Sequence, residues 1–147
     1  VAVEDPDQVE EVAAAGHTIA GHSWTHTRGS EMAYDEVVDE ALRTAALLTD
    51  LSGAPSRYVR PPYEKRDAPR YADLLDDHGL TVVTWSVDPR DWATSEPVEI
   101  AVGVLDNLHP GAIVILHDGG PDRTPTVEAL PLIVHGANLA GYRFVSL

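Results

Sequence analysis

Two histidines, His22 and His26, stand four residues apart in the segment His-Ser-Trp-Thr-His. Two imidazoles at this spacing can reach one metal ion, either from a helical turn or from a tight loop. The alternative is a pair of surface histidines without a ligand. The chain contains no cysteine, so disulfides and thiolate metal sites are both excluded.

Two further polar clusters follow segments that read as strands. Residues 60–63 are Arg-Pro-Pro-Tyr, and because proline fixes φ, this rigid backbone could aim the amide of Tyr63 at one point. A stiff turn is the alternative interpretation. Residues 88–92 are Asp-Pro-Arg-Asp-Trp, which places two carboxylates and an indole after an apolar strand. The alternative there is a solvated loop with Trp92 packed in the core.

A fourth cluster follows a continuous apolar run, residues 112–116, which is typical of a buried parallel strand. The run is followed by His117 and then by the glycines at 119–120. A histidine in this position is a candidate general acid or base, and a hydrogen-bonded core histidine is the alternative. The remaining histidines lie in or beside expected helices, where we expect surface or capping roles: His17, His78, His109 and His135.

Alternating helices and strands must position these clusters. Apolar spacing and capping signals predict five helices, over residues 5–16, 34–52, 67–79, 97–108 and 124–139. We expect Asp67 to cap the third helix, and Pro131 to kink the last one or delay its start. Short apolar runs predict five strands, at residues 17–21, 57–60, 80–87, 112–116 and 142–147.

This alternation indicates a parallel sheet or barrel with helices outside it. In such α/β architectures, functional residues gather at the carboxyl ends of the strands. The polar clusters stand at four of these expected ends. The sequence therefore predicts that the elements of the fold, and not one continuous motif, assemble any site.

Composition restricts the classes of partner. The 147 residues correspond to one domain, and 44% of them are hydrophobic, which is enough for a core. With 24 acidic and 10 basic residues the net charge is −14. We expect no nucleic-acid partner, because binding to phosphates requires a basic surface. No run approaches the roughly 20 apolar residues of a membrane span, so we expect none.

Taken in order, the four clusters resemble the motifs of the NodB-homology polysaccharide deacetylases, carbohydrate esterase family 4. The second family motif, His-Ser/Thr-x-x-His, is similar to residues 22–26, and the third, of the type Arg-x-Pro-Tyr, to residues 60–63. The fourth contains Asp-Trp, as residues 91–92 do, and the fifth ends in hydrophobic-x-His, as residues 115–117 do. The resemblance covers essentially the whole chain.

The resemblance implies a distorted (β/α) barrel and a metal-dependent deacetylation. The divalent metal of this family is usually zinc, with cobalt or nickel possible, and it polarises the acetyl carbonyl. By the same resemblance His22 and His26 would be two of its ligands, beside one aspartate. The backbone amide of Tyr63 would join the metal in stabilising the oxyanion.

The other motif residues receive roles from the same resemblance. His117 would protonate the leaving amine, and Asp91 would orient His117 and stabilise its charged form. Arg60 would pair with the catalytic base and position it. Three residues would line the acetyl pocket: Pro62, Trp92 and Ile115.

One family motif has no counterpart in these 147 residues. The first motif, Thr-Phe-Asp-Asp, supplies the base and the third metal ligand, and Asp76-Asp77 lies in an expected helix at the wrong end of the barrel. We expect this motif and the first strands to lie upstream of residue 1, so that the barrel is N-terminally truncated. Its open edges would then be available for self-association.

Two functions remain open at this point. The first is a hydrolase that removes N-acetyl or O-acetyl groups from an acetylated polysaccharide such as peptidoglycan, chitin or xylan. The second is a non-catalytic sugar-binding or interaction domain derived from the same fold. The presence of His117, Asp91 and Arg60 favours the hydrolase, because loss of function would be expected to erode them. The family resemblance also implies an extracellular or cell-envelope location.

Overall fold

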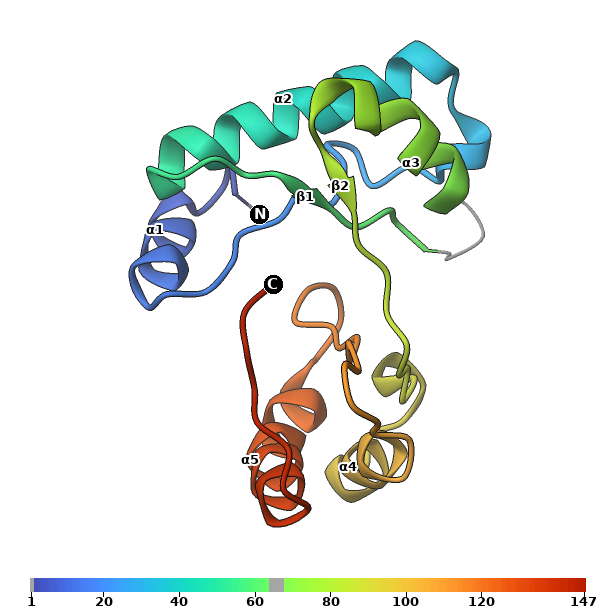
Figure 1. Ribbon diagram of the computed structural model, residues 1–147. Helices are drawn as coiled ribbons and strands as arrows, with labels where there is room; N and C mark the ends of the chain where they lie inside the picture. The colour runs from blue at the N-terminus through green and yellow to red at the C-terminus, as the bar shows by residue number, and fades with distance from the viewer. Residues whose placement is uncertain (1, 64–67) are drawn as a thin grey trace. The chain divides into compact units, whose positions relative to one another are not determined.

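The computed structural model describes residues 2–63 and 68–147. They form two compact units, the first comprising Val1–Thr84 with Ser146–Leu147 and the second Trp85–Val145. Figure 1 shows the order of the elements along the chain. The predicted helix cap at Asp67 lies outside the described residues.

The helices of the first unit follow the local signals in the sequence. Helix α1 (Pro6–Ala14) has its proline in the first turn, where the missing N–H costs nothing. Helix α2 (Tyr34–Ser52) ends at Gly53, whose φ of 69° is left-handed. Helix α3 (Ala68–Leu75) continues into the 3₁₀ turn η3 (Asp76–His78), which ends at Gly79 in the same left-handed conformation.

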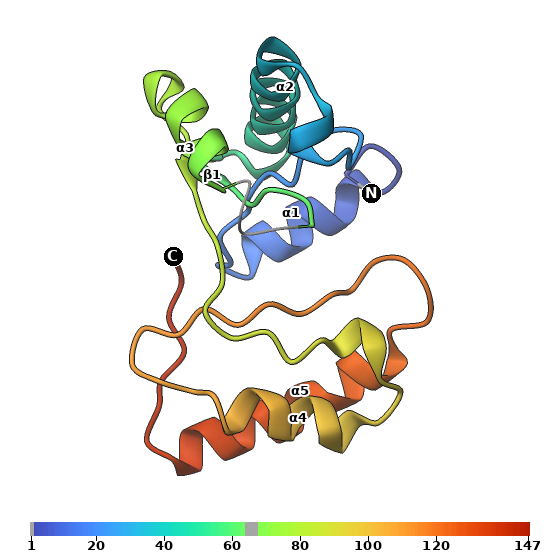
Figure 2. The same ribbon diagram turned by 90° about the vertical axis from the view of Figure 1, so that its right-hand side faces the viewer.

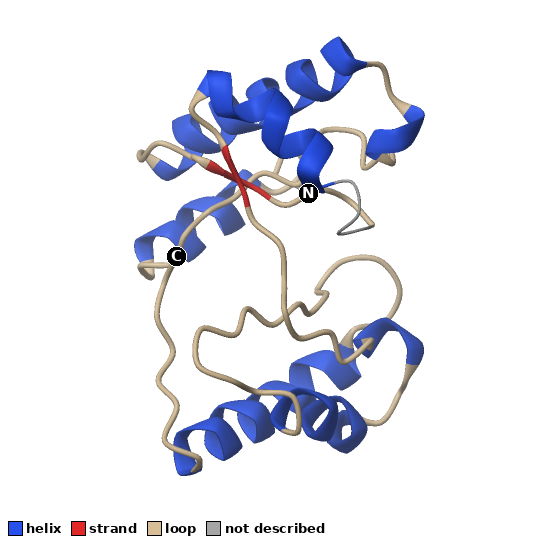
Figure 3. Cartoon of the chain, turned by 45° about the vertical axis from the view of Figure 1, so that its right-hand side comes forward, coloured by secondary structure: helices blue, strands red, loops and turns tan. Residues whose placement is uncertain are grey.

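The strands of the first unit are parallel but short. Strands β1 (Tyr58–Val59) and β2 (Thr81–Val82) pair in parallel, with Tyr58 opposite Thr81, and Figure 3 shows them in red. An isolated parallel bridge joins Gly21 to Val59. The segment that ends at Gly21 therefore runs beside β1. It is followed by residues 22–26, here called the histidine loop, and β1 is followed by residues 60–63, so the first two clusters lie at the ends of neighbouring segments.

The predicted barrel is not seen among the described residues. Two predicted strands contain β1 and β2, whereas the segments at 17–21 and 112–116 each contribute one isolated bridge, Gly21–Val59 and Val87–Val114. Residues 142–147 form no strand. The parallel direction was predicted correctly, but the lengths were not. A strand needs a hydrogen-bonded neighbour, and an apolar pattern does not show whether that neighbour is present.

The core of the first unit joins α2 to α3 and β1. Val37 and Ala41 on α2 are buried together with Val59, Tyr71 and Leu75. The segment directly after the histidine loop can approach this core closely because residue 29 is glycine. A Cβ atom there would lie 2.4 Å from Cε2 of Tyr71. The 3₁₀ turn η1 (Gly29–Glu31) is thereby held against α3, directly after the histidine loop.

The second unit is built on α4 (Pro97–Leu105) and α5 (Thr124–Leu139), which lie side by side in Figure 2. Their buried contact consists of five apolar side chains: Ile100, Ala101, Val104, Ala129 and Ile133. The short 3₁₀ helix η4 (Asp91–Ala93) precedes α4. This unit therefore has a core of its own, on which the third and fourth clusters are placed.

Of the two effects predicted for Pro131, a kink or a late start of the last helix, the late start is wrong. Helix α5 begins at Thr124 and contains Pro131 in its interior. Pro125 in the first turn has a φ suited to a helix, and buried Ala129 and Ile133 hold the segment on both sides of Pro131. Tertiary packing thus outweighs the local cost of the interior proline. Within the described parts of both units, no helix has the length and apolar character that crossing a membrane requires.

Candidate functional site

The loop with the two histidines begins directly after Gly21, the residue that bridges to β1. The rings of His22 and His26 lie edge to face, with centroids 4.9 Å apart and an interplanar angle of 76°. Nδ1 of His22 lies 2.6 Å from the carbonyl oxygen of Arg60. A carbonyl acceptor fixes the ring with its proton on Nδ1, which assigns any metal contact of this ring to Nε2.

The backbone of this loop is held in an uncommon conformation. Ser23 and His26 have φ values of 61° and 60°, a left-handed region that costs a non-glycine residue about 1–3 kcal/mol. The hydroxyl of Ser23 accepts a hydrogen bond from the backbone N–H of His26 at 2.9 Å. The turn is thus closed on itself and brings both imidazoles to one side of a short segment.

Residues 60–63 bring Tyr63 to the same loop. Pro61 and Pro62 are fully buried, and Tyr63 follows them with a φ of 66° and a side chain that is 54% exposed. The Tyr63 hydroxyl lies 3.2 Å from Nδ1 of His26, and the two rings are T-shaped with centroids 4.8 Å apart. The sequence drew attention only to the amide of Tyr63, whereas the structure also places its side chain against a predicted metal ligand.

The first unit contains the two histidines that the sequence predicts as metal ligands, His22 and His26. Nδ1 of each imidazole lies within hydrogen-bonding distance of a protein oxygen atom. In metal sites, a contact of this kind fixes the orientation of the histidine ring and leaves its other nitrogen for the metal. Nitrogen ligands of this kind suit zinc, which uses three protein ligands in catalytic sites. Among residues 2–63 and 68–147, no group of three or more His, Cys, Asp or Glu side chains could hold a metal. The two histidines therefore fit zinc as two of its ligands.

In the second unit a buried carboxylate holds His117 by its ring and by its backbone. Oδ1 of Asp91 lies 2.8 Å from Nδ1 of His117, and Oδ2 accepts the His117 backbone N–H at 2.8 Å. Oδ2 also accepts a hydrogen bond from the Thr126 hydroxyl at 3.0 Å. Asp91 is 2% exposed, and the side chain of His117 is 30% exposed. Because Asp91 occupies Nδ1 of His117, the ring can exchange a proton with a ligand through Nε2.

The surroundings of Asp91 stabilise its ionised form. Burial alone would raise the pKa of this carboxyl, since a charge is poorly solvated in the interior. The hydrogen bonds from the His117 ring, the His117 backbone and Thr126, together with the charge of His117, outweigh burial and hold the pKa of Asp91 below its ordinary value. The ionised carboxylate thus accepts a hydrogen bond from the Nδ1–H of His117.

The family of the chain follows from comparison with known proteins. Residues 1–87 match the family model described as polysaccharide deacetylase. A chitooligosaccharide deacetylase from Bradyrhizobium sp. (strain ANU 289) is 35% identical over an alignment of 149 positions, which covers 93% of this chain and 68% of that protein. The chain belongs to the polysaccharide deacetylase family.

Solved structures of the same family share the fold of this polysaccharide deacetylase domain. The match to a polysaccharide deacetylase from Bacillus cereus covers 99% of this chain and 74% of the Bacillus cereus chain, with a TM-score of 0.87 and 28% identity. The match to a carbohydrate esterase family 4 pseudoenzyme from Bacillus anthracis covers 97% of this chain and 49% of the pseudoenzyme chain, with a TM-score of 0.84 and 26% identity. The chain spans between 30% and 68% of the lengths of three curated relatives.

The predicted pocket residues of the deacetylase domain differ in exposure. Trp92 is 52% exposed, and the guanidinium of Arg90 lies 4.8 Å from the centroid of its ring. The alternative that Trp92 packs in the core is therefore wrong. Ile115 is 6% exposed and is fixed by a backbone hydrogen bond to Val87 at 3.0 Å. Pro62, which is fully buried, belongs to the rigid segment before Tyr63.

Sequence reasoning missed Thr126 in this deacetylase domain. It lies in the first turn of α5 and is 4% exposed, and its hydroxyl reaches Asp91. The sequence offers only a weak signal, a hydroxyl residue at the start of the helix that follows the His117 loop. Such residues are common near helix starts because they cap the backbone, so the contact with a carboxylate 35 residues away could not be read from position alone.

Proposed function

We propose that this domain is part of a metal-dependent hydrolase that removes N-acetyl groups from a polysaccharide. The observation that carries the proposal is the Asp91–His117 pair. A buried carboxylate with a lowered pKa occupies Nδ1 of the histidine, so the imidazole can present a proton at Nε2. Cleavage of an amide needs such an acid, because the amine leaves readily only when it is protonated.

Each cluster has its own part in the proposed reaction. His22 and His26 would hold the divalent metal, with zinc as the first choice and cobalt or nickel as alternatives. When bound, the metal polarises the acetyl carbonyl. The amide of Tyr63, aimed by the buried prolines at 61–62, would donate a hydrogen bond to the oxygen that becomes negatively charged. His117 would give its proton to the leaving nitrogen.

The catalytic base is assigned to no described residue. In the family an aspartate of the first motif takes the proton from the attacking water, and Arg60 would pair with that aspartate. We propose that the first motif and the first strands of the barrel lie outside these 147 residues. The domain would then be complete only together with that segment, and the open edges left without it would favour self-association.

The substrate class is proposed from relatives and from exposed aromatic rings. Relatives of this chain include chitooligosaccharide deacetylases and peptidoglycan-N-acetylglucosamine deacetylases. Tyr63 and Trp92 are each about half exposed, and aromatic faces of this kind suit contact with sugar rings. We propose an N-acetylglucosamine polymer of the cell envelope as substrate, acted on outside the membrane, with O-acetylated xylan as the alternative.

A second candidate function is a catalytically inactive sugar-binding or interaction domain. Two observations favour it: a pseudoenzyme of the family matches 97% of the chain, and the described residues lack a third metal ligand. The complete hydrogen bonding of Asp91 to His117 favours the enzyme, because a domain that only binds sugar needs no oriented proton donor. The two functions differ in whether acetate is released.

The test is acetate release from acetylated chito-oligosaccharide and from peptidoglycan, with zinc or with a chelator. The protein is this chain extended upstream through its own gene. We expect zinc-dependent release that falls about 10²–10⁴-fold in His117→Ala and that His22→Ala abolishes. His135→Ala, which removes an exposed histidine from α5, is the matched control and should leave the rate unchanged. An extended protein that releases no acetate with any metal would establish the inactive alternative.

A further inference from the structure

One acidic side chain outside the family motifs holds the histidine loop at its centre. Glu40 lies on α2, and its Oε2 accepts hydrogen bonds from the backbone N–H of Trp24 at 3.1 Å and of Thr25 at 3.3 Å. Its Oε1 accepts the Thr25 hydroxyl at 2.5 Å. A single carboxylate thus receives three donors from two neighbouring residues, and these two residues lie between His22 and His26.

The loop needs such a partner because its own backbone is strained. Ser23 and His26, the residues that flank the pair bound by Glu40, both have left-handed φ values. Each such conformation is strained for a residue other than glycine and persists only where surrounding contacts hold it. Charge-assisted hydrogen bonds to backbone N–H groups are among the stronger ones in proteins, so Glu40 can offset a large part of that strain.

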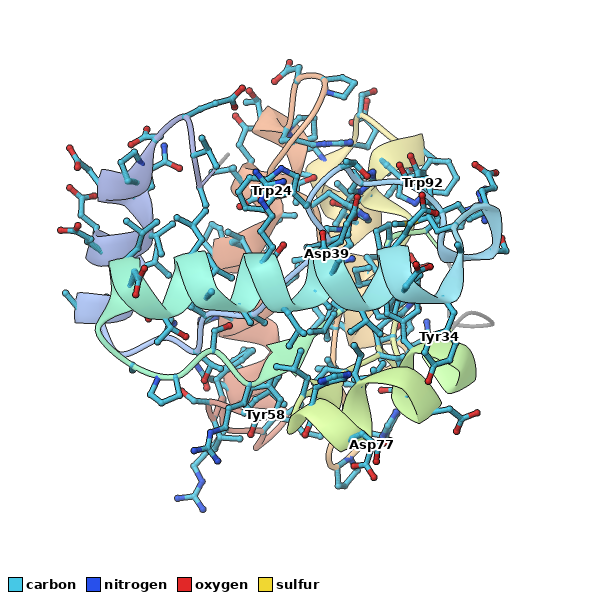
Figure 4. All side chains as sticks on the ribbon, turned by 90° about the horizontal axis from the view of Figure 1, so that it is seen from above. Trp24, Tyr34, Asp39, Tyr58, Asp77 and Trp92 are labelled. Atoms are coloured by element: carbon cyan, nitrogen blue, oxygen red, sulfur yellow. The ribbon has the colours of Figure 1, made fainter. Side chains whose placement is uncertain are left out.

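Helix α2 gives Glu40 a rigid base. The next residue, Ala41, is buried, and the Thr44 hydroxyl donates to the carbonyl oxygen of Glu40 at 2.7 Å. Arg43, three residues along the helix, places its guanidinium 3.7 Å from the centroid of the Trp24 ring. The helix therefore holds Trp24 both by its amide and by its ring. Figure 4 shows Trp24 and Asp39 on the same side of α2.

We infer that Glu40 is a positioning residue of the metal site. Its carboxylate sets the conformation of the loop in which His22 and His26 can reach one ion. The inference rests on the proposed function, because it requires these histidines to bind metal. Glu40 itself is not a ligand in this arrangement, since both of its oxygen atoms accept hydrogen bonds from the loop.

The experiment titrates the chain, extended upstream through its own gene, with Zn²⁺ alone and follows the NMR resonances of the His22 and His26 rings. Glu40→Ala should weaken zinc binding about 10–100-fold, the usual loss when a residue that orients metal ligands is removed. Glu40→Gln keeps an oxygen acceptor for the two N–H groups and should retain most of the affinity. Asp39→Ala removes the same charge from an exposed neighbour on α2 and should bind zinc like the wild type.

Two results would overturn the inference. One is Glu40→Ala with wild-type affinity. The other is an equal loss in Glu40→Ala, Glu40→Gln and Asp39→Ala, which would mean that negative charge near the ion matters and loop geometry does not. If Glu40→Ala does not fold, Thr25→Val replaces it, because this change deletes the hydroxyl bond to Oε1. Thr27→Val is its control, because it deletes the Thr25–Thr27 hydroxyl contact that Thr25→Val also loses and leaves the bond to Glu40 in place. A smaller but measurable loss is expected for Thr25→Val, and unchanged affinity would overturn the inference equally.

A further variant separates this inference from the proposed function. His22→Ala should abolish zinc binding whatever the role of Glu40. If His22→Ala binds zinc like the wild type, or if the wild type extended upstream binds none, the proposed metal site is wrong and the role of Glu40 is lost with it. If His22→Ala loses zinc while Glu40→Ala keeps it, only the positioning role is wrong.

Discussion

Asp91 accepts two hydrogen bonds from the same residue, since the ring Nδ1 and the backbone N–H of His117 each lie 2.8 Å from one of its carboxylate oxygens. This double contact fixes both the orientation of the imidazole and the backbone that carries it. A single ring contact would leave the His117 segment able to move relative to the carboxylate. The Asp91–His117 pair is thus preorganised, and both residues lie in the second compact unit of the chain.

The first prediction concerns catalysis by this pair. In the extended enzyme, Asp91→Asn should lower the rate of acetate release, because an amide stabilises the imidazolium form of His117 less well than a carboxylate does. The alkaline limb of the pH–rate profile should move to lower pH for the same reason. The measurement is the rate across the pH range at saturating zinc. An unchanged profile would assign Asp91 a purely structural role.

A second prediction links Asp91 to stability in acid. Its folded pKa lies below its ordinary value of 3.8, so in acid the unfolded state binds this proton before the folded state does. The contribution is therefore fully present above the unfolded pKa and is lost as the pH falls through the folded pKa. Urea unfolding of the wild type from pH 5 downward should show this loss. Asp91→Asn should show a flatter dependence, and identical slopes would contradict the linkage.

Helix signals are local in this chain, and for that reason the helices could be predicted. Pro6, Gly53 and Gly79 mark helix starts and ends in the sequence, and the structure has them there. Strand direction followed from the alternation of elements. Strand length depends on neighbours, which the sequence did not show.

The contacts around the predicted site residues depend on tertiary structure. Thr126 and Glu40 reach their partners from residues 35 and 15–16 positions away. Neither stands in a motif, so no local pattern could identify them. The motif residues were found because their types recur at fixed spacing, whereas the groups that hold them are chosen by the packing of α2 and α5.

The third prediction tests Thr126. Thr126→Val keeps the shape of the side chain but leaves Oδ2 of Asp91 with one donor fewer in a buried position. Loss of one partner of a buried charged group costs about 1–3 kcal/mol of unfolding free energy, and we expect a loss in that range together with slower acetate release. Thr124→Val, which changes an exposed threonine of the same helix turn, should leave the catalytic rate unchanged. Equal effects of both variants on the rate would contradict a role for the Thr126 hydroxyl.

A fourth prediction concerns the packing behind the histidine loop. Gly29→Ala would place a Cβ atom 2.4 Å from the ring of Tyr71, which is 2% exposed and held in the core. Overpacking of this kind costs about 1–3 kcal/mol. Thermal unfolding should show the loss, whereas Gly119→Ala, where nothing lies within 4 Å of the added atom, should change stability little. A neutral Gly29→Ala would mean that η1 can move away from α3.

The last prediction is that these 147 residues by themselves release acetate at no meaningful rate. The family's first motif is absent from the sequence, so the general base, worth about 10²–10⁴ in rate, is missing. Two histidines without a third ligand hold zinc weakly, which also reduces the several kcal/mol that a metal can contribute. The comparison is acetate release from an acetylated chito-oligosaccharide by this chain and by the extended one, each with zinc or cobalt added. Equal activity of the two proteins would show that the base lies within residues 1–147 and that its proposed placement upstream is wrong.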